Sequence, residues 1–156
     1  MQAVRLGAPR RERDAPVPGR LERELRGELE GQGYRFFSHG DTEVILTAFH
    51  AWGEALLPRL NGMFAFAIFD EDRFTLARDP IGIKPLYYAM DGRSLVFGSE
   101  VKALHASSEV PAGINDAAVY EYFQFRGVSG EQTLFKNVHS LLPGHRMIAN
   151  SEGISV

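Results

Sequence analysis

Cysteine is absent from this chain of 156 residues. These residues can therefore form no disulfide bond, no thiolate metal site and no covalent intermediate on a cysteine sulfur. Long apolar runs are missing as well: none approaches the ~18 residues that a membrane-spanning helix needs, and no secretory apolar segment follows Met1. We therefore expect a cytoplasmic protein that does not associate with membranes.

Several catalytic signatures are also lacking. The phosphate-binding patterns GxxxxGK[ST] and GxGxxG, the nucleophile pattern GxSxG and the zinc pattern HExxH do not occur. We interpret Ser99, in FGSE, as a helix N-cap rather than as a nucleophile. The five histidines are too scattered to predict a metal site: His39, His50, His105, His139 and His145.

Charge is unevenly distributed along the chain, whose net charge is −3. Residues 1–20 carry five arginines against two acidic residues, and three prolines, without a helix or strand period. They predict a flexible arm. The arm has no aromatic residue for base stacking and the remainder is acidic, so we expect no nucleic-acid partner.

Hydrophobic periodicity predicts an α+β layered domain over residues 21–150, followed by a short tail, residues 151–156. The stretch 63–69 is apolar on both faces, which is typical of a strand inside a sandwich of layers. Asp41 has the residue type of an N-cap for the second helix. The expected helices span residues 21–30, 42–57, 99–106 and 116–124, and the expected strands 34–37, 63–69, 74–77, 86–90 and 95–98, with turns at Asp91–Gly92 and Pro143–Gly144.

Two clusters of residues carry candidate chemistry. In HGDTE (39–43), Gly40 and Asp41 lie where an extended segment gives way to a helix. The simplest interpretation of this pattern is a plain N-cap with a glycine turn. The alternative is a carboxylate that holds a cationic ligand group beside a glycine that permits close approach. In RDPIGIKPL (78–86), Arg78 and Asp79 precede a loop made rigid by two prolines. The simplest interpretation is a structured turn with a salt bridge.

An ordered series of motifs resembles the glutaminase domain of asparagine synthetases. The segments are HGDTEVIL (39–46), RLNGMFAFAIFD (59–70), LARDPIGIKPLYYA (76–89), FGSEVKAL (97–104) and LLPGH (141–145), and the resemblance covers about residues 21–150. Amidophosphoribosyltransferases carry something similar to ARDPxGIKPL, whereas GMFAFAIFD and SEVKAL favour asparagine synthetase.

This resemblance implies an N-terminal-nucleophile hydrolase fold, an αββα sandwich that is incomplete here at its N-terminus. It further implies that glutamine is hydrolysed by an N-terminal cysteine whose α-amine is the base, with an NGE motif as oxyanion hole. An arginine would bind the glutamine carboxylate. Asp41, beside Gly40, matches the aspartate that binds the glutamine α-amino group.

The remaining family residues have no match. The cysteine, the NGE motif and the arginine are not found, so we expect no catalytic residue and no amidase activity from this chain by itself. ATP and Mg would belong to the synthetase domain, which leaves no cofactor here. The alternative is a non-catalytic module that docks onto a synthetase-type partner, with Arg78 and Asp79 in a structural loop near the interface. Missing strands would also expose a sheet edge and favour self-association.

Overall fold

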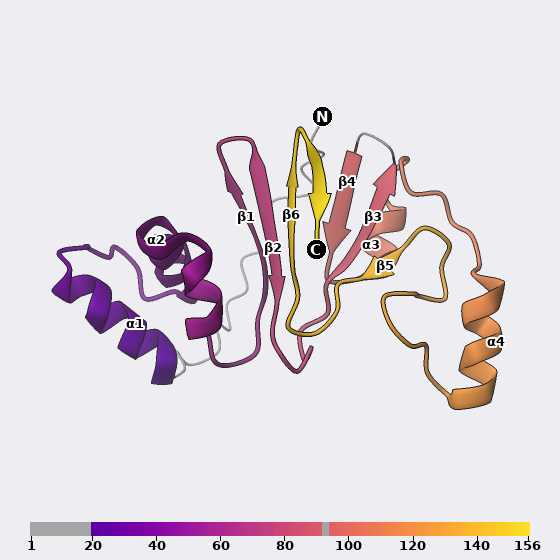
Figure 1. Ribbon diagram of the computed structural model, residues 1–156, viewed down its shortest axis with the longest axis horizontal. Helices are drawn as coiled ribbons and strands as arrows, with labels where there is room; N and C mark the ends of the chain where they lie inside the picture. The colour runs from indigo at the N-terminus through magenta and orange to yellow at the C-terminus, as the bar shows by residue number, and fades with distance from the viewer. Residues whose placement is uncertain (1–19, 92–93) are drawn as a thin grey trace. The chain divides into compact units, whose positions relative to one another are not determined.

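The computed structural model describes residues 20–91 and 94–156 (Figure 1). Within this part the chain forms two compact units, residues 20–62 and residues 63–156. The expected arm, apart from Arg20, and Gly92 of the expected Asp91–Gly92 turn lie outside the described residues.

The first unit is helical and contains α1 (Arg20–Gly31), α2 (Asp41–Trp52) and the 3-10 helix η1 (Gly53–Arg59). Leucines spaced four apart predict one apolar stripe on α1, and Leu25 and Leu29 of this stripe are buried. The strand expected over residues 34–37 is not formed: Phe37 is 95% exposed and the segment is irregular. That prediction was wrong, because aromatic composition alone indicates a strand only where a neighbouring strand supplies hydrogen bonds.

Helix α2 begins and ends at other residues than expected. Its N-cap is Gly40, and Asp41 is the first helical residue. It ends at Trp52 because Gly53 takes a positive φ of 56°, and the chain continues as a 3-10 turn that contains Pro58. The expected buried face is largely present, with Val44, Ala48, Phe49 and Leu56 inside and Ile45 and Trp52 partly exposed.

The second unit contains two antiparallel sheets, as expected. One sheet has the strand order β1-β2-β6-β7 and the other β4-β3-β5. Their strands are β1 (Ala65–Asp70), β2 (Arg73–Arg78), β3 (Tyr87–Asp91), β4 (Ser94–Gly98), β5 (His139–Ser140), β6 (Arg146–Asn150) and β7 (Gly153–Ser155). The residues expected as a tail thus contribute β7, which pairs with β6.

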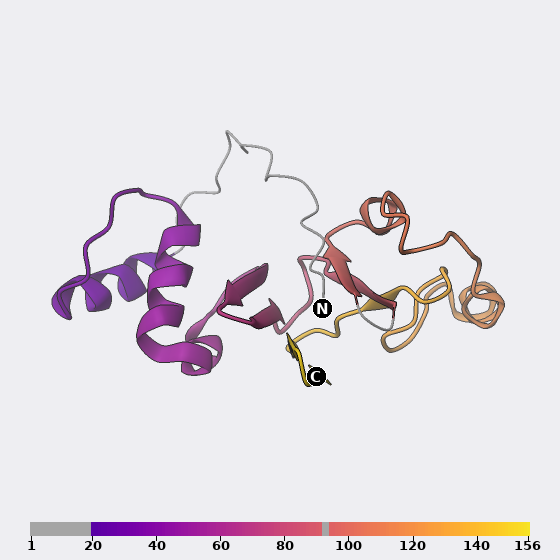
Figure 2. The same cartoon turned by 90° about the horizontal axis from the view of Figure 1, so that it is seen from above.

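Both sheets contribute to one hydrophobic core. Leu76 and Met147 come from the larger sheet, Tyr88 and Leu95 from the smaller, and all are buried. A second cluster covers the other face of the smaller sheet, where Val96 packs with Leu104 of α3 (Val101–His105). Figure 2 shows α3 on this face. The helix α4 (Asp116–Phe125) follows.

The strand β1 is less buried than the two-sided apolar pattern predicts. Ile68 is buried, but Ala67 and Phe69 are exposed, Phe69 by 57%. The prediction was wrong for this face, because an apolar pattern does not determine which elements cover a face of the sheet. The strand β1 is also the outermost of its sheet and, among the described residues, pairs only with β2.

Ser99 does not have the expected capping role. The N-cap of α3 is Glu100, which makes no side-chain capping hydrogen bond. At the start of α4, in contrast, the side chain of Asn115 caps the helix by accepting the N–H of Ala118. No helix in the described part of the chain is long and apolar enough to cross a membrane.

Candidate functional site

The start of α2 is organised by the carboxylate of Glu43. Its Oε1 accepts the N–H of Phe37 at 2.8 Å, and its Oε2 accepts the N–H and the hydroxyl of Ser38 at 2.7 and 2.6 Å. The Ser38 Oγ in turn accepts the N–H of Gly40 at 3.3 Å. The Ser38 hydroxyl and the two backbone N–H groups keep the pKa of Glu43 below its ordinary value. The segment that leads into α2 is therefore held by Glu43, the third residue of the helix.

Gly40 and Asp41 are next to each other at the end of this segment. Gly40 has φ −85° and ψ 146°, which any residue can adopt, and a Cβ there would meet only the Ser38 Oγ at 3.7 Å. Nothing within the described chain therefore requires glycine at this position. The Asp41 carboxylate makes no hydrogen bond with another described residue and lies at the positive end of the α2 dipole. Among the described residues, the acceptor sites of the Asp41 carboxylate are therefore not taken up by protein donors.

Arg78 is directed towards backbone carbonyls of its own loop and of the segment around β5. Its Nε donates to the carbonyl of Lys84 at 2.8 Å and one terminal nitrogen to that of Gly82 at 2.8 Å. The other terminal nitrogen donates to Ser140 Oγ at 2.9 Å and to the carbonyl of Leu141 at 2.6 Å. All of the guanidinium nitrogens are thus engaged within the sheet unit.

Asp79 is directed towards the amides of the same loop. Its side chain is 1% exposed, and it accepts the N–H groups of Ile81, Ile83 and Lys84 at 3.0 to 3.2 Å. Burial alone would raise the pKa of Asp79, but the surrounding backbone N–H groups outweigh it, and the pKa lies below its ordinary value. The two side chains therefore satisfy backbone groups instead of forming the salt bridge that their adjacency suggested.

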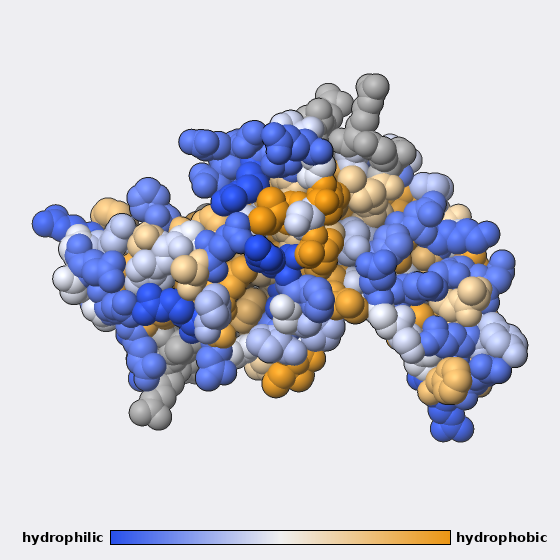
Figure 3. All heavy atoms as spheres, viewed as in Figure 1, coloured by the Kyte–Doolittle hydropathy of each residue, from blue (hydrophilic) through white to orange (hydrophobic). Residues whose placement is uncertain are grey.

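The loop that Arg78 and Asp79 hold by hydrogen bonds has an apolar outer surface. Ile81 is 78% and Ile83 is 53% exposed. Figure 3 shows apolar surface at the end of the sheet unit where, in Figure 1, the chain turns after β2. Gly82, between them, has φ +73°. The loop presents two isoleucines at fixed positions.

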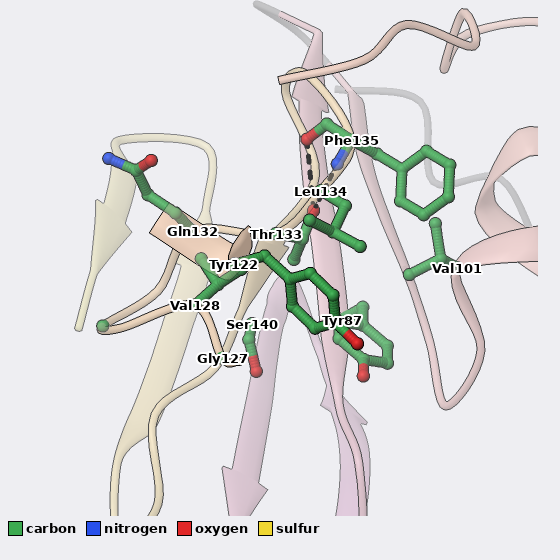
Figure 4. A pocket seen from close by; sticks show the side chains of 11 residues that line it. Tyr87, Val101, Tyr122, Gly127, Val128, Gln132, Thr133, Leu134, Phe135 and Ser140 are labelled. Atoms are coloured by element: carbon green, nitrogen blue, oxygen red, sulfur yellow. Dashed lines mark hydrogen bonds between the residues drawn. The ribbon is translucent and has the colours of Figure 1, made fainter. Parts of the chain in front are cut away.

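A pocket of about 350 Å³ lies elsewhere in the sheet unit, and no sequence motif predicted it. In Figure 4 the ring of Phe135 is directed towards Val101, and the Thr133 hydroxyl bonds the backbone of Phe135. No charged side chain lines the pocket. The lining residues are Tyr87, Val101, Tyr122, Gly127, Val128, Gly130, Gln132, Thr133, Leu134, Phe135 and Ser140. The pocket mixes apolar and uncharged polar side chains and holds none of the predicted site residues.

The predicted residues thus fall into two groups. Gly40 and Asp41 belong to the helical unit, and Arg78 and Asp79 belong to the sheet unit. Among the residues that the structure describes, no three histidine, aspartate or glutamate side chains gather to hold a metal ion. Glu43 and Ser38 were missed as parts of the site, although Glu43 lies within the motif that singled out Asp41.

Comparison with known proteins places these features in a family. Residues 22–156 match the glutamine amidotransferase domain family. The chain is 36% identical over 139 residues to asparagine synthetase [glutamine-hydrolyzing] 3 of Bacillus subtilis, which covers 85% of this chain and 22% of that protein. It is 38% identical over 132 residues to asparagine synthetase [glutamine-hydrolyzing] 1 of the same organism, covering 83% and 21%. The chain thus spans about a fifth of the length of these relatives.

Solved structures support the fold. The glutamine phosphoribosylpyrophosphate amidotransferase of B. subtilis matches 85% of this chain and 25% of its own with a TM-score of 0.58 and 26% identity. A second solved structure, described as the allosteric regulatory enzyme of purine biosynthesis, has a TM-score of 0.59 and 25% identity over 86% of this chain and 25% of its own. The expected α+β fold of the N-terminal-nucleophile hydrolase type is confirmed.

Proposed function

Because this chain belongs to the glutamine amidotransferase domain family and is similar to glutamine-hydrolysing asparagine synthetases, we propose that it binds glutamine for a domain that supplies ammonia to asparagine synthesis from aspartate. The observation that carries the proposal is that the Asp41 carboxylate, at the start of α2 in the family motif, has no hydrogen-bond partner among the described residues. Glutamine would enter with its α-ammonium group towards this carboxylate.

The geometry of the α2 start supports this role for Asp41. Glu43, two residues along, is engaged with Ser38 and Phe37, whereas the Asp41 carboxylate accepts no hydrogen bond from the described residues. An ammonium group can therefore pair with Asp41 without displacing a protein donor. Gly40 adds no side chain that would limit the approach.

Amide cleavage is not expected of these 156 residues by themselves. The covalent route requires a thiolate that attacks the glutamine side-chain carbonyl, forms a thioester and releases ammonia, and the chain contains no cysteine. We propose that the nucleophile and the oxyanion donors come from residues outside this chain's sequence. ATP and Mg would bind in the synthetase part of such a protein and not here.

A titration of the 156-residue chain with L-glutamine tests the binding role. We expect saturable but weak binding, with a Kd above about 1 mM, because no arginine clamp for the carboxylate is assigned here. Asp41→Asn should weaken it about fivefold, the effect of one partly exposed charge pair. Asp116→Asn is the matched control, because Asp116 is also the first residue of a helix. Equal losses in both variants, or no loss in Asp41→Asn, would refute the role of Asp41.

The same preparation tests the absence of catalysis. We expect no glutamate release above the rate in buffer when the purified chain is incubated with glutamine. Release that follows the protein through purification would show that these residues contain a nucleophile that the family comparison does not identify.

The exposed isoleucines favour a second candidate function, docking onto a synthetase-type partner. The loop held by Arg78 and Asp79 is rigid and presents Ile81 and Ile83 to solvent, which is typical of an interaction surface. Association with the synthetase part of the B. subtilis relative, measured with the wild-type chain and with Ile81→Ser, tests it. Equal affinity for both would exclude this loop as the contact.

A further inference from the structure

We propose that Glu43 is the positioning residue of the glutamine site: its carboxylate holds the segment before α2 so that Asp41 meets the α-ammonium group. The inference depends on the proposed glutamine binding at Asp41 and adds the residue that makes this geometry possible. The hydrogen bonds of Glu43 indicate this role, which the family motif does not assign to it.

The hydrogen bonds form a displaced capping box. Glu43 is the third residue of α2, and in a capping box such a residue accepts the N–H of the N-cap, which here is Gly40. Instead, Glu43 reaches further back to the N–H groups of Phe37 and Ser38. The Ser38 hydroxyl bridges the gap, since it donates to Glu43 and accepts the N–H of Gly40. The segment from Phe37 to Gly40 is thereby tied to the first turn of the helix.

This tie explains why two acidic side chains in one motif can have different roles. Both oxygens of Glu43 already accept hydrogen bonds, so its charge is compensated by protein donors and by the nearby cation Arg26. Asp41 has no such donors among the described residues and keeps its acceptor sites for a ligand. The first acid of the motif would bind and the second would orient.

Removing the hydrogen bonds of Glu43 should release the segment before α2. The charge of Asp41, which would pair with the ligand, stays in place. The amide nitrogen of a glutamine at position 43 cannot accept a hydrogen bond, so Glu43→Gln loses an acceptor for Phe37 or for Ser38. The backbone around Gly40 would then sample several conformations, and only a fraction would place Asp41 for binding. The apparent affinity falls by that fraction.

Amide hydrogen exchange and a glutamine titration, both followed by NMR on the 156-residue chain, test the proposal together. In Glu43→Gln we expect faster exchange of the Phe37 and Ser38 amides, by about fivefold or more for one lost hydrogen bond, and a fall in glutamine affinity of similar size. Glu30→Gln, at an exposed position of α1, is the control and should change neither. Ser38→Ala, which lies outside the helix, should reproduce the loss of affinity by releasing Gly40.

Asp41→Asn separates this inference from the proposed function. It should lower glutamine affinity while the Phe37 and Ser38 amides stay protected. If Asp41→Asn leaves affinity unchanged, the proposed function fails, and the exchange data still show whether Glu43 holds the segment. If Glu43→Gln leaves both exchange and affinity unchanged, Glu43 has no positioning role. If it lowers affinity while the two amides stay protected, Glu43 contacts the ligand directly and the positioning role is likewise refuted.

Discussion

Arg78 and Asp79, adjacent at the end of β2, hold one loop by opposite means. The Arg78 guanidinium donates to the carbonyls of Gly82 and Lys84, and the Asp79 carboxylate accepts the N–H groups of Ile81, Ile83 and Lys84. Lys84 is thus held at both its N–H and its carbonyl. Buried backbone groups require partners, and in this loop the Arg78 and Asp79 side chains supply them.

Replacing Asp79 should destabilise the sheet unit. The side chain is buried, and the amide nitrogen of Asp79→Asn cannot accept the N–H groups that the carboxylate now accepts. One buried donor left without a partner costs about 1–3 kcal/mol. Urea unfolding should show this loss, whereas Asp72→Asn, which makes the same change at an exposed position, should lie within about 0.5 kcal/mol of wild type. Equal stability of the two variants would contradict the role of Asp79.

A side chain at Gly82 should destabilise the sheet unit. Its φ of +73° disfavours other residues, and a Cβ would lie 2.7 Å from Cγ of Pro143 and 3.3 Å from Cζ of Arg78. We expect Gly82→Ala to lower the free energy of unfolding by about 1–3 kcal/mol. Gly127→Ala is the control, because no atom lies within 4 Å of its Cβ position. A thermal unfolding midpoint that is the same for both variants would argue that the loop is free to rearrange.

The sequence predicted the local elements better than their surroundings. The hairpin of β1 and β2 could be predicted because apolar strands flank a short polar turn, and both the alternation and the turn are local properties. The exposure of Phe69 could not be predicted, because it depends on which elements cover that face of the sheet, and this is not a local property. Glu43 was missed for a related reason: its partners are set by backbone geometry at Phe37 and Ser38, which composition does not encode.

The edge of β1 should promote association. Among the described residues β1 has a strand neighbour on one side only, and Phe69 and Ala67 are exposed on it. Unpaired edges with apolar side chains template pairing with other chains, and a lysine on the edge opposes it. We expect the apparent mass of the chain in solution to rise with concentration, and Phe69→Lys to reduce that rise. A chain that stays monomeric at every concentration would exclude pairing along β1.

The lowered pKa of Glu43 predicts how the α2 start responds to acid. The folded carboxylate titrates below the ordinary value of 4.5, so its hydrogen bonds contribute stability that is complete above that value. This contribution is lost as the pH falls through the lower folded pKa. The amide shifts of Phe37 and Ser38 should therefore titrate together with a midpoint below 4.5. In Ser38→Ala the midpoint should rise, because the Ser38 hydroxyl is the largest cause of the shift. A midpoint at or above the ordinary value in wild type would contradict the observed contacts.

The pKa of Tyr88 is raised, so its contribution to stability should be lost at high pH instead of at low pH. It is 8% exposed, and burial, followed by the nearby negative charge of Glu131 and the hydrogen bond to it at 3.3 Å, raises its pKa from 10.0 to about 12. For this acid the neutral form is favoured in the folded state. Its contribution to stability is therefore complete below pH 10.0 and is lost as the pH rises towards 12.

A substitution at Glu131 separates two causes of the raised Tyr88 pKa, burial and the nearby negative charge. Glu131→Gln removes the negative charge and keeps an acceptor, so the pKa of Tyr88 should fall but stay above 10.0, because burial is the largest cause. Phenolate absorbance reports the titration, and subtracting the curve of Tyr88→Phe isolates this residue from the other four tyrosines. A pKa unchanged at about 12 in Glu131→Gln would mean that burial acts alone, and a return to 10.0 would mean that Tyr88 is not buried in solution. Because Tyr88 lies in the core shared by both sheets, that second outcome would also contradict the packing of the sheet unit.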